Sequence, residues 1–588
     1  MGIDPVDLRV MWDRLIHVTE ECWATIWRTA FSTIIGEAQD FGVELLDADG
    51  RSLAHSPRSM PVFNLTLPRA VAALMARFPR ESLQEGDVLV TNDPWVCAGH
   101  LFDVAAVTPV FRRGTLVGIV GSIAHCSDIG GSKDSARVRE VYEEGLQIPP
   151  MRLYRAGECN RDLFDLIAAN VRQPATVIGD IQAQVAANLV GARRLLEFMD
   201  EYGLSDLGPL AREIQDRSEA AMRAAIAALP EGVHVGAATC DGVAARLTLP
   251  VAVRVAGDAL TVSFAGAPPQ EPRGGVNCTY SYTAAHAAYA LKCLLAPDLP
   301  SSHGAFRPIT VEAPEGSVLA CRRPASVGVR TRVGWYIATA IFQALADAMP
   351  DRVKAHTASP LSVTAYGDGF NDHMLLGGGN GAWRGGDGQS ALLFPTSAAN
   401  VAVEMFEART PVLVEKKALV AGSGGAGRWR GGLGQEVVLR KLWDDGAPVL
   451  VAAHVEGARV DVPGLFGGAP GARAGGWVAR GGGPLEAAAV GDPAPEGAVG
   501  GAGRHSAPRH ATGGGGGESA PAGSTTGPAG GQALPHAAAG EGNAGGGAAA
   551  REAAWEPIPP GGAVVLTRAD ERVILRVGGG SGYGQPPG

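Results

Sequence analysis

The sequence predicts an α+β fold with mixed and antiparallel sheets, and three observations lead to this fold class. Apolar residues recur with helical spacing over 178–202 and 210–229. From Arg246 onward they alternate with other residues, which is the period of a strand. Beyond Leu361, up to about Gly471, the chain is rich in strand-like segments and glycine. We therefore expect segregated helices and sheets, and not a doubly wound nucleotide-binding fold.

The individual elements follow from the local pattern in chain order. Helices are expected over 7–35 (as one or two helices), 67–78, 160–172, 178–202, 210–229, 283–295 and 334–349. Strands are expected over 43–48, which ends in the turn Asp49-Gly50, over 86–90, and in hairpins over 246–264 and 563–577. Pro250 favours an edge position for its strand, because proline cannot donate to a sheet ladder.

Composition limits the class of protein. The chain has 588 residues, enough for about two to four domains, and 46% of them are hydrophobic. Its net charge of −10 gives no indication of nucleic-acid binding. The eight cysteines lack CxxC pairing, which favours a reducing compartment, and we see neither a signal peptide nor a membrane span. A cytoplasmic location is expected.

One stretch differs from the rest of the chain. Residues 475–555 are mostly Gly, Ala and Pro, with too few large apolar side chains to offset the entropy of ordering. We expect a disordered insertion over 474–556, which interrupts the last part of the fold. The predicted organisation is an N-terminal α+β region at 1–240, a strand-rich mixed region at 241–473, the insertion, and a C-terminal hairpin with a Gly-rich end at 557–588.

The strongest candidate site lies between Thr91 and Gly131. Two apolar runs, 104–111 and 116–124, read as strands joined by a turn at Arg112-Arg113-Gly114. Folding about position 113 places residue 100 opposite about 126 and residue 103 opposite about 123. Two imidazoles and one or two carboxylates then gather at the open end, and they can hold a divalent metal; they are His100, Asp103, His125 and Asp128. The alternative is that these side chains are ordinary turn and cap residues.

Asp128 and two further residues near this hairpin, Glu144 and Arg172, are candidates for a role in the chemistry. Asp128 could be a fourth ligand or could orient His125. Glu144 follows a predicted loop and could act as a general base toward a metal-activated water, or could belong to a solvated acidic turn. Arg172 could clamp a phosphate or carboxylate, or could be a structural arginine.

Other motifs point to structure more than to chemistry. Cys97 and Cys126 flank the candidate ligands, and burial as small apolar residues is the favoured interpretation. The segment 422–427 matches GxGxxG, but no helix follows it, so a structural loop is expected. No GxxxxGK[ST] occurs anywhere in the chain, so ATP binding through a Walker A loop is not expected.

Several ordered motifs resemble the hydantoinase B/oxoprolinase family. They are Asn92-Asp93-Pro94-Trp95, Gly99-His100-Leu101-Phe102-Asp103, Thr108-Pro109-Val110-Phe111, His125-Cys126-Ser127-Asp128-Ile129-Gly130-Gly131, Glu144-Gly145-Leu146-Gln147-Ile148-Pro149-Pro150, Asn170-Val171-Arg172-Gln173-Pro174, Gly179-Asp180-Ile181-Gln182-Ala183-Gln184 and Arg428-Trp429-Arg430-Gly431-Gly432-Leu433-Gly434. The resemblance spans roughly residues 10–472 and resumes at about 557. That family includes the B-type subunits of ATP-dependent hydantoinases, the C-terminal half of 5-oxoprolinase and the α-type subunits of acetone carboxylases.

The resemblance implies a hydantoinase B-like fold and a metal site. In the carboxylase branch the metal is held by a His-x-x-Asp and a later His, which correspond by position to His100, Asp103 and His125. Manganese, zinc and iron all suit such a ligand set. Relatives work with a separate hydantoinase A-type partner, which binds ATP and phosphorylates the substrate carbonyl. The implied function is the hydrolase component that opens a cyclic amide such as a hydantoin or 5-oxoproline. A carboxylase component, or a non-catalytic scaffold for the A-type partner, remains an alternative.

Overall fold

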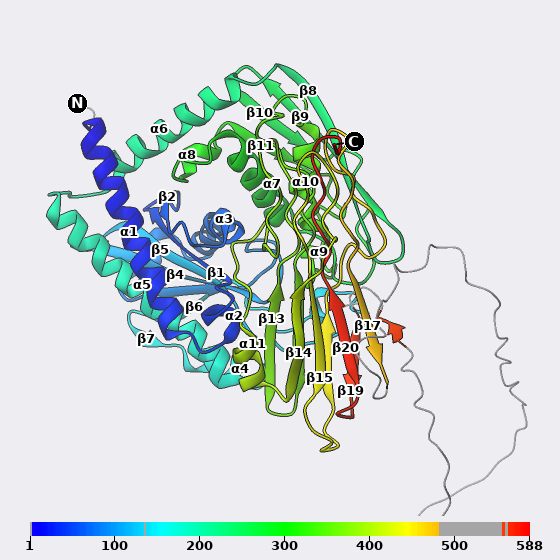
Figure 1. The fold of residues 1–588 in the computed structure, drawn as a ribbon. Helices are drawn as coiled ribbons and strands as arrows, with labels where there is room; N and C mark the ends of the chain where they lie inside the picture. Colours follow the sequence, from blue (N-terminus) through cyan, green and yellow to red (C-terminus); the bar gives the residue numbers. More distant parts are fainter. Residues whose placement is uncertain (1–2, 135–136, 481–554, 559–561, 588) are drawn as a thin grey trace, which may run out of the picture. The chain divides into compact units, whose positions relative to one another are not determined.

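Four sheets and the helices packed on them make up the part of the chain that the structure describes (Figure 1). The structure is a computed structural model, and it describes residues 3–134, 137–480, 555–558 and 562–587. The first sheet has seven strands, the second and third have four each, and the fourth has five. Most strand pairs are antiparallel, while β10 and β11 are parallel. The predicted α+β class with mixed and antiparallel sheets is therefore confirmed.

The first sheet is wholly antiparallel and carries the candidate site. Its strand order is β2-β1-β5-β4-β3-β6-β7. The strands are β1 (Phe41–Asp47), β2 (Ser52–His55), β3 (Val88–Thr91), β4 (Asp103–Arg112), β5 (Thr115–His125), β6 (Met151–Arg155) and β7 (Glu158–Cys159). The central strands β5 and β4 are almost entirely buried along their length. A strand pair buried on both faces resists fraying, so residues at its end are held in fixed positions.

The hairpin of β4 and β5 confirms the predicted strands but corrects their register. Asp103 pairs with His125, two residues beyond the partner at about 123 that the sequence suggested. The turn is centred between Arg113 and Gly114, and one extra residue of β5 forms a bulge near Phe111. The half-residue shift of the turn and the bulge together produce the difference. In the observed register Asp103 and His125 lie directly opposite one another.

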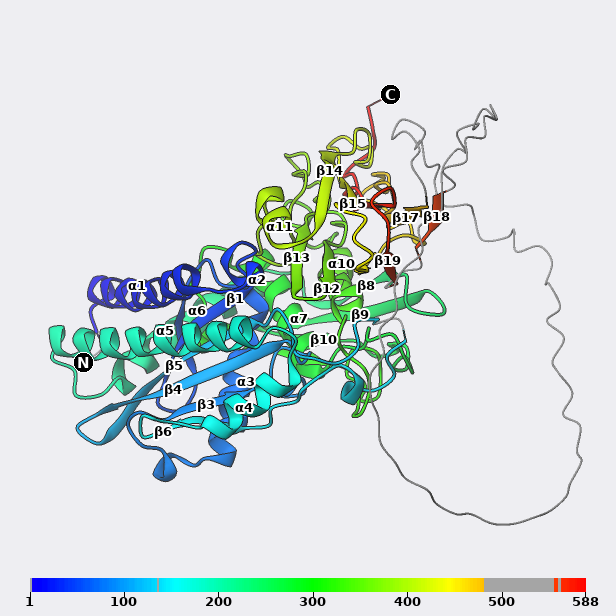
Figure 2. The ribbon, with the colours of Figure 1, turned by 90° about the horizontal axis from the view of Figure 1, so that it is seen from below.

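Helices cover both faces of this sheet. α1 (Pro5–Thr29) and α5 (Pro174–Glu201) run side by side over one face (Figures 1 and 2). Gly191 of α5 lies so close to Val120 of β5 that an added Cβ would be 3.0 Å from the valine side chain. Leu67 of α3 (Pro61–Arg77) packs on the next residue of β5, Gly121. Neighbouring residues of a strand face opposite ways, so α5 and α3 lie on opposite faces.

The second sheet has the order β11-β10-β9-β8 and lies against α7 (Tyr280–Leu295) and α10 (Tyr336–Ala344). Its strands are β8 (Gly232–Cys240), β9 (Leu247–Ala256), β10 (Ala259–Ser263) and β11 (Ile309–Glu312). The strand that contains Pro250 was predicted to lie at the edge of its sheet. This prediction is wrong, because β9 pairs with both β8 and β10. Pro250 is tolerated because the pairing of β9 with β10 ends at Ala252, so the proline lies beyond that ladder.

Two further sheets contain the C-terminal half of the chain. Their orders are β13-β12-β16-β19 and β14-β15-β20-β17-β18. The strands are β12 (Leu361–Gly367), β13 (Phe370–Leu376), β14 (Val412–Leu419), β15 (Gln435–Lys441), β16 (Val449–Ala453), β17 (Gly475–Ala479), β18 (Trp555–Pro557), β19 (Ala563–Leu566) and β20 (Arg572–Arg576). The predicted hairpin over 563–577 is wrong, because β19 pairs with β16 and β20 pairs with β15 and β17. Glu571 holds the corner between them by accepting hydrogen bonds from the N–H groups of Thr567 and Arg568.

Both ends of the insertion predicted over 474–556 form strands, which corrects the predicted bounds. Residues 475–479 form the buried strand β17, and 555–557 form β18, which pairs with it. Pairing with β20 supplies the apolar contacts that the local composition lacks. The remainder of that prediction, residues 481–554, lies outside the described residues.

The other helices connect the sheets. They are α2 (Thr33–Gly36), α4 (Arg161–Asn170), α6 (Gly208–Ala227), α8 (His303–Phe306), α9 (Thr331–Gly334) and α11 (Val403–Arg409), with 3-10 turns at Arg80–Ser82 and Val141–Glu143. The helix predicted at 67–78 begins earlier, at Pro61, and contains Pro68. No helix within the described ranges has the length and apolar character needed to cross a membrane.

Glycine replaces side-chain packing among the C-terminal loops. Segments around Gly379, Gly432 and Gly580 lie so close that an added Cβ at each position would meet a neighbouring backbone atom at 2.0 Å. The GxGxxG-like segment 422–427 belongs to this layer, and Gly424 is held against the carbonyl of Gly431 in the same way. The predicted structural loop at 422–427 is confirmed, since these glycines allow backbones to approach one another.

Candidate metal centre

The end of the β4–β5 hairpin gathers three potential metal ligands. Asp103 is the first residue of β4, and His125 is the last residue of β5. His100 lies in the loop that leads into β4. Each of the three offers one ligand atom, and these atoms all lie within 4.8 Å of one another. The structure thus brings together three of the four residues that the sequence placed at the open end of the hairpin, without Asp128.

The carboxylate of Asp103 is at the centre of this histidine cluster (His100, Asp103 and His125). Its Oδ1 lies 2.8 Å from Nε2 of His100 and 3.4 Å from Nδ1 of His125. The centroids of the two imidazole rings are 5.0 Å apart. His100 and Asp103 are buried, and the side chain of His125 is 17% exposed. The cluster is therefore largely removed from bulk water.

The hydrogen bonds of His100 decide which of its nitrogens carries the proton. Its Nδ1 lies 3.2 Å from the carbonyl oxygen of Gly328, so the neutral ring donates this bond from Nδ1. Burial, with the nearby Arg330 charge, lowers the pKa of His100 to about 4, which makes the neutral ring the stable form. Its Nε2 then presents a lone pair, not a proton, to Asp103.

Two lone pairs therefore face each other inside the protein. Neither Nε2 of His100 nor Oδ1 of Asp103 has a hydrogen-bond partner within the described residues. Burial alone would raise the pKa of Asp103, whereas the guanidinium of Arg330 on Oδ2 lowers it and favours the ionised carboxyl. Buried lone pairs at 2.8 Å repel unless a cation lies between them. Two imidazole nitrogens and one carboxylate oxygen form a donor set that suits a divalent transition metal.

Two charged residues outside the predicted set hold this cluster. Arg330 donates from Nη2 to Oδ2 of Asp103 at 2.7 Å and from Nε to the carbonyl of Ala98 at 2.7 Å. Its guanidinium thus occupies one carboxylate oxygen of Asp103 and leaves the other for the cluster. Asp40 precedes β1, and its Oδ2 is 3.6 Å from Nδ1 of His125. Burial raises the pKa of Asp40 to about 6.

Asp128 lies apart from the three-residue group and has other partners. Its Oδ1 accepts from Nζ of Lys133 at 2.7 Å and from Nη1 of Arg172 at 2.9 Å. Burial alone would raise the pKa of Asp128, but Lys133 and the N–H of Arg172 outweigh this effect and keep it low. A carboxylate already neutralised by two cations is better suited to fixing the loop after His125 than to metal ligation.

Arg172 makes internal contacts in place of an open anion clamp. Besides its bond to Asp128, its Nη2 donates to the carbonyl of Gly131 at 2.6 Å. The side chain is 44% exposed, so one side of the guanidinium reaches solvent. These bonds tie the start of α5 to the Gly130-Gly131 turn.

Glu144 is connected to the cluster through a peptide group. Its Oε1 accepts from the N–H groups of Val327 and Gly328, at 2.8 and 2.7 Å. The carbonyl of the same Gly328 holds Nδ1 of His100. Burial raises the pKa of Glu144 to about 8, and its Oε2 has no partner within the described part of the chain. This geometry suits a neutral carboxyl that positions His100 through the 327–328 backbone.

Sequence reasoning missed the aromatic and cationic groups beside His125. Phe102 stacks on the imidazole of His125, with ring centroids 5.2 Å apart and planes at 16°. Lys133 lies over the rings of Phe102 and Tyr366, at 5.4 and 4.5 Å from their centroids. Lys133 follows the Gly130-Gly131 turn, and this turn after His125 is the only sequence feature that could have placed Lys133 near the cluster. Tyr366 belongs to β12, and only the fold brings it to the site. Burial lowers the pKa of Lys133 to about 8.

Both cysteines that flank the cluster behave as small buried residues. Cys97 and Cys126 have at most 1% of their surface exposed. Burial raises the pKa of each thiol above its ordinary value. A protonated, buried thiol is a poor ligand and a poor nucleophile, in agreement with the favoured interpretation.

Known proteins resemble this chain along most of its sequence. Residues 4–586 match the family described as hydantoinase B/oxoprolinase. A protein of Pseudomonas sp. strain NS671, provisionally named as the B component of a D-/L-hydantoinase, is 31% identical over 442 residues, which cover 71% of this chain and 74% of the relative. The beta component of the caprolactamase of Pseudomonas jessenii is 29% identical over 441 residues, covering 72% and 75% of the two chains. Both names describe one chain of a multi-chain enzyme.

Solved structures share the fold at lower identity. The crystal structure of the ATP-dependent caprolactamase from Pseudomonas jessenii superposes with a TM-score of 0.78 and 23% identity, covering all of this chain and 93% of the other. A nucleotide-free structure of acetone carboxylase gives a TM-score of 0.77 at 17% identity, covering 99% of this chain and 76% of the other. The match along nearly the whole sequence leads to one conclusion: this chain belongs to the hydantoinase B/oxoprolinase family.

Proposed function

We propose that this chain is the hydrolytic component of an ATP-dependent enzyme that opens a cyclic amide, with a divalent metal held by His100, Asp103 and His125. The observation that carries the proposal is the convergence of three ligand atoms of His100, Asp103 and His125 within 4.8 Å, with Nε2 of His100 and Oδ1 of Asp103 buried 2.8 Å apart. Such an arrangement is favourable with a cation bound and unfavourable without one. Family membership and the names of the amide-hydrolysing relatives support the reaction class.

The residues around the cluster have distinct tasks in this proposal. A divalent ion in this ligand set would polarise a substrate carbonyl or lower the pKa of a water molecule. Arg330 fixes the rotamer of Asp103, and the carbonyl of Gly328 fixes the ring of His100. Burial raises the pKa of Asp40, next to His125, to about 6, so this carboxyl can exchange a proton with a bound water or substrate nitrogen. Phe102 shields one face of His125 from water.

Activation of the amide must come from a partner. An unactivated lactam is a poor electrophile, and this chain contains no Gly-Lys pair and hence no Walker A loop. We propose that ATP is bound by a hydantoinase A-type partner, which phosphorylates the carbonyl, after which this chain turns the activated intermediate over. Lys133 is a cation near the cluster that could contact the phosphate of that intermediate.

Two alternatives predict different products. A carboxylase component would consume bicarbonate with a ketone, and a scaffold would only stabilise the partner. The hydrolase is preferred because two relatives, each matched over about three quarters of its own length, are named for hydantoin and caprolactam substrates. The likeness to acetone carboxylase, at 17% identity, concerns the fold.

A reconstitution assay tests the proposal. This chain alone should neither hydrolyse ATP nor open 5-oxoproline, hydantoin or caprolactam. With its A-type partner it should open one of these rings only while ATP is hydrolysed. His125→Ala should keep the complex intact and abolish ring opening. Ring opening by this chain without ATP, or unchanged activity of His125→Ala in the complex, would refute the proposal, and ATP-dependent carboxylation of acetone would favour the carboxylase.

A further inference from the structure

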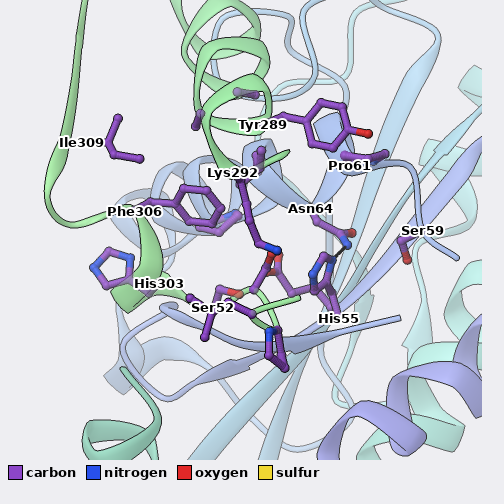
Figure 3. A pocket seen from close by; sticks show the side chains of 18 of the residues that line it. Ser52, His55, Ser59, Pro61, Asn64, Tyr289, Lys292, His303, Phe306 and Ile309 are labelled. Carbon is purple, nitrogen blue, oxygen red and sulfur yellow. Dashed lines mark hydrogen bonds between the residues drawn. The ribbon is translucent and has the colours of Figure 1, made fainter. Parts of the chain in front are cut away.

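A cavity of about 1080 Å³ lies apart from the histidine cluster, since His100, Asp103 and His125 do not line it. Residues of β1, β2 and α3 form one side of the cavity. Residues of α7, α8, β11 and the 297–301 loop form the other side (Figure 3). A volume of this size is typical of a site for a small organic molecule. No step of the reaction proposed above uses this cavity.

The charged side chains around the cavity leave an excess of positive charge. The lining contains Arg9, Arg51, Arg69 and Lys292 as cations, with Asp13, Glu44 and Asp298 as carboxyl groups. Arg9 pairs with Asp13, and Arg51 pairs with Asp49. Glu44 is buried, and burial raises its pKa to about 8, which favours its neutral form at physiological pH. Arg69 and Lys292 are then balanced only by Asp298, which is exposed.

Lys292 and His55 provide two donors at one end of the cavity. Lys292 points from α7 toward His55, with Asn64 beyond it (Figure 3). Within the described residues Lys292 makes no ion pair, and its Nζ donates only to the carbonyl of Pro297 at 3.0 Å. The side-chain amide of Asn64 hydrogen-bonds Nδ1 of His55, which leaves the ring proton of a neutral His55 on Nε2. An ammonium group and an imidazole N–H close together form a site for an anion.

The rest of the cavity wall is mostly apolar. Phe306 and Ile309 lie on the side of Lys292 away from His55, and Tyr289 lies near Pro61 on the other side (Figure 3). On α7 the side chains that face the cavity between its aromatic residues are small, namely Ala284, Ala285 and Ala288. Small residues on a helix that borders a cavity leave room for a ligand instead of filling the space. A bound molecule would therefore place one anionic group at Lys292 and an apolar body along α7.

We propose that this cavity binds a small organic acid, whose carboxylate contacts Lys292 and His55 and whose apolar body lies against Ala288, Phe306 and Ile309. The inference rests on residues outside the histidine cluster, so it is independent of the proposed metal and of the partner. It assigns to this chain a second small-molecule site, which could sense a product or an unrelated carboxylate.

Calorimetric titration of the full-length chain tests the site with matched probes. We expect 4-phenylbutanoate to bind, and 4-phenylbutanamide, which has the same shape without the charge, to bind at least tenfold more weakly. Acetate, which lacks the apolar body, should also bind at least tenfold more weakly. Lys292→Met should weaken binding of the acid tenfold or more, and Ala288→Phe should abolish it by filling the cavity. Lys416→Met, at a half-exposed lysine on β14, is the matched control and should bind as the parent does.

Several outcomes would overturn the assignment. These are absence of 4-phenylbutanoate binding, equal affinity for the acid and the amide, and unchanged affinity in both Lys292→Met and Ala288→Phe. Lys292→Gln keeps a donor for the Pro297 carbonyl and replaces Lys292→Met if the latter unfolds, as monitored by circular dichroism. His125→Ala should bind the acid normally; loss of binding in that variant would place the acid at the histidine cluster and contradict the inference.

Discussion

Asp103 and His125 are paired directly across the β4–β5 hairpin, with Oδ1 of Asp103 lying 3.4 Å from Nδ1 of His125. The backbone ladder, and not a flexible loop, therefore fixes two of the three cluster residues. The third, His100, is fixed by its bond to Gly328. A site held on paired strands keeps its geometry without a bound ligand, which favours tight and selective metal binding.

We predict one divalent metal ion per chain at this cluster. His100→Ala and His125→Ala should each reduce the metal content of purified protein to below about one tenth of the parent, because each removes one of three ligands. His17→Ala serves as the control, since His17 is an exposed histidine on α1. Elemental analysis after dialysis measures the result. Equal metal in all four proteins would rule out the cluster as the site.

Arg330 should matter for metal binding without being a ligand. Its bond to Oδ2 of Asp103 fixes the carboxylate, so Arg330→Met should weaken metal affinity about 10- to 100-fold. Because it also leaves a buried carboxylate without its partner, the substitution should cost about 3–5 kcal/mol of stability. Arg330→Lys keeps the charge and should recover part of both losses. Chelator competition and chemical unfolding provide the two measurements, and an unchanged metal affinity in Arg330→Met would contradict this role.

Glu144 allows a positioning role to be separated from general-base catalysis. Burial raises its pKa from the ordinary value near 4.5 to about 8, so between these pH values the folded chain binds a proton that the unfolded chain lacks. Stability should therefore fall as pH rises through this window, by at most about 1.4 kcal/mol per pH unit from this group. Glu144→Gln resembles the protonated form and should flatten that slope in urea unfolding measured from pH 5 to 8.

The same variant distinguishes the two roles in activity. If Glu144 only holds the 327–328 backbone, Glu144→Gln should retain ring-opening activity within about tenfold, because glutamine can still accept both N–H bonds. Loss of more than about a hundredfold in kcat, with metal content unchanged, would identify a general base. Glu143, its neighbour on the exposed side, offers the control Glu143→Gln.

The sequence was sufficient where the determining contacts are local. The β4–β5 hairpin could be predicted because its two strands are joined by a short turn, although the bulge near Phe111 shifted the register. The contacts that complete the site are distant along the chain. His100 is 228 residues from Gly328, and Asp103 is 227 residues from Arg330. No local pattern around Arg330 marks it as the partner of Asp103.

The errors in the C-terminal region have the same origin. Residues 563–566 and 572–576 look like a hairpin because a short polar turn joins two apolar runs. In the fold each run finds a better partner elsewhere, β19 on β16 and β20 between β15 and β17. The glycine-rich loops gave no periodic signal, since their packing depends on backbone contacts between distant segments. Pairing between segments far apart in sequence is what local patterning cannot supply.

The ends of the predicted insertion lead to a final prediction about stability. Ala479 of β17 and Trp555 of β18 are directly paired, so the chain leaves and re-enters the fourth sheet at one place. Replacing residues 481–554 by a loop of about four to six Gly and Ser residues should preserve both strands, because loop-closure entropy changes slowly with length. Arg480 should be kept, since it bonds Glu571 at 2.8 Å. We expect a melting temperature within about 3 °C of the parent.

A longer deletion that also removes 475–479 should lower the melting temperature strongly, because β17 is buried against β20. A large drop for the shorter deletion would show that residues 481–554 contribute to the stability of the fold.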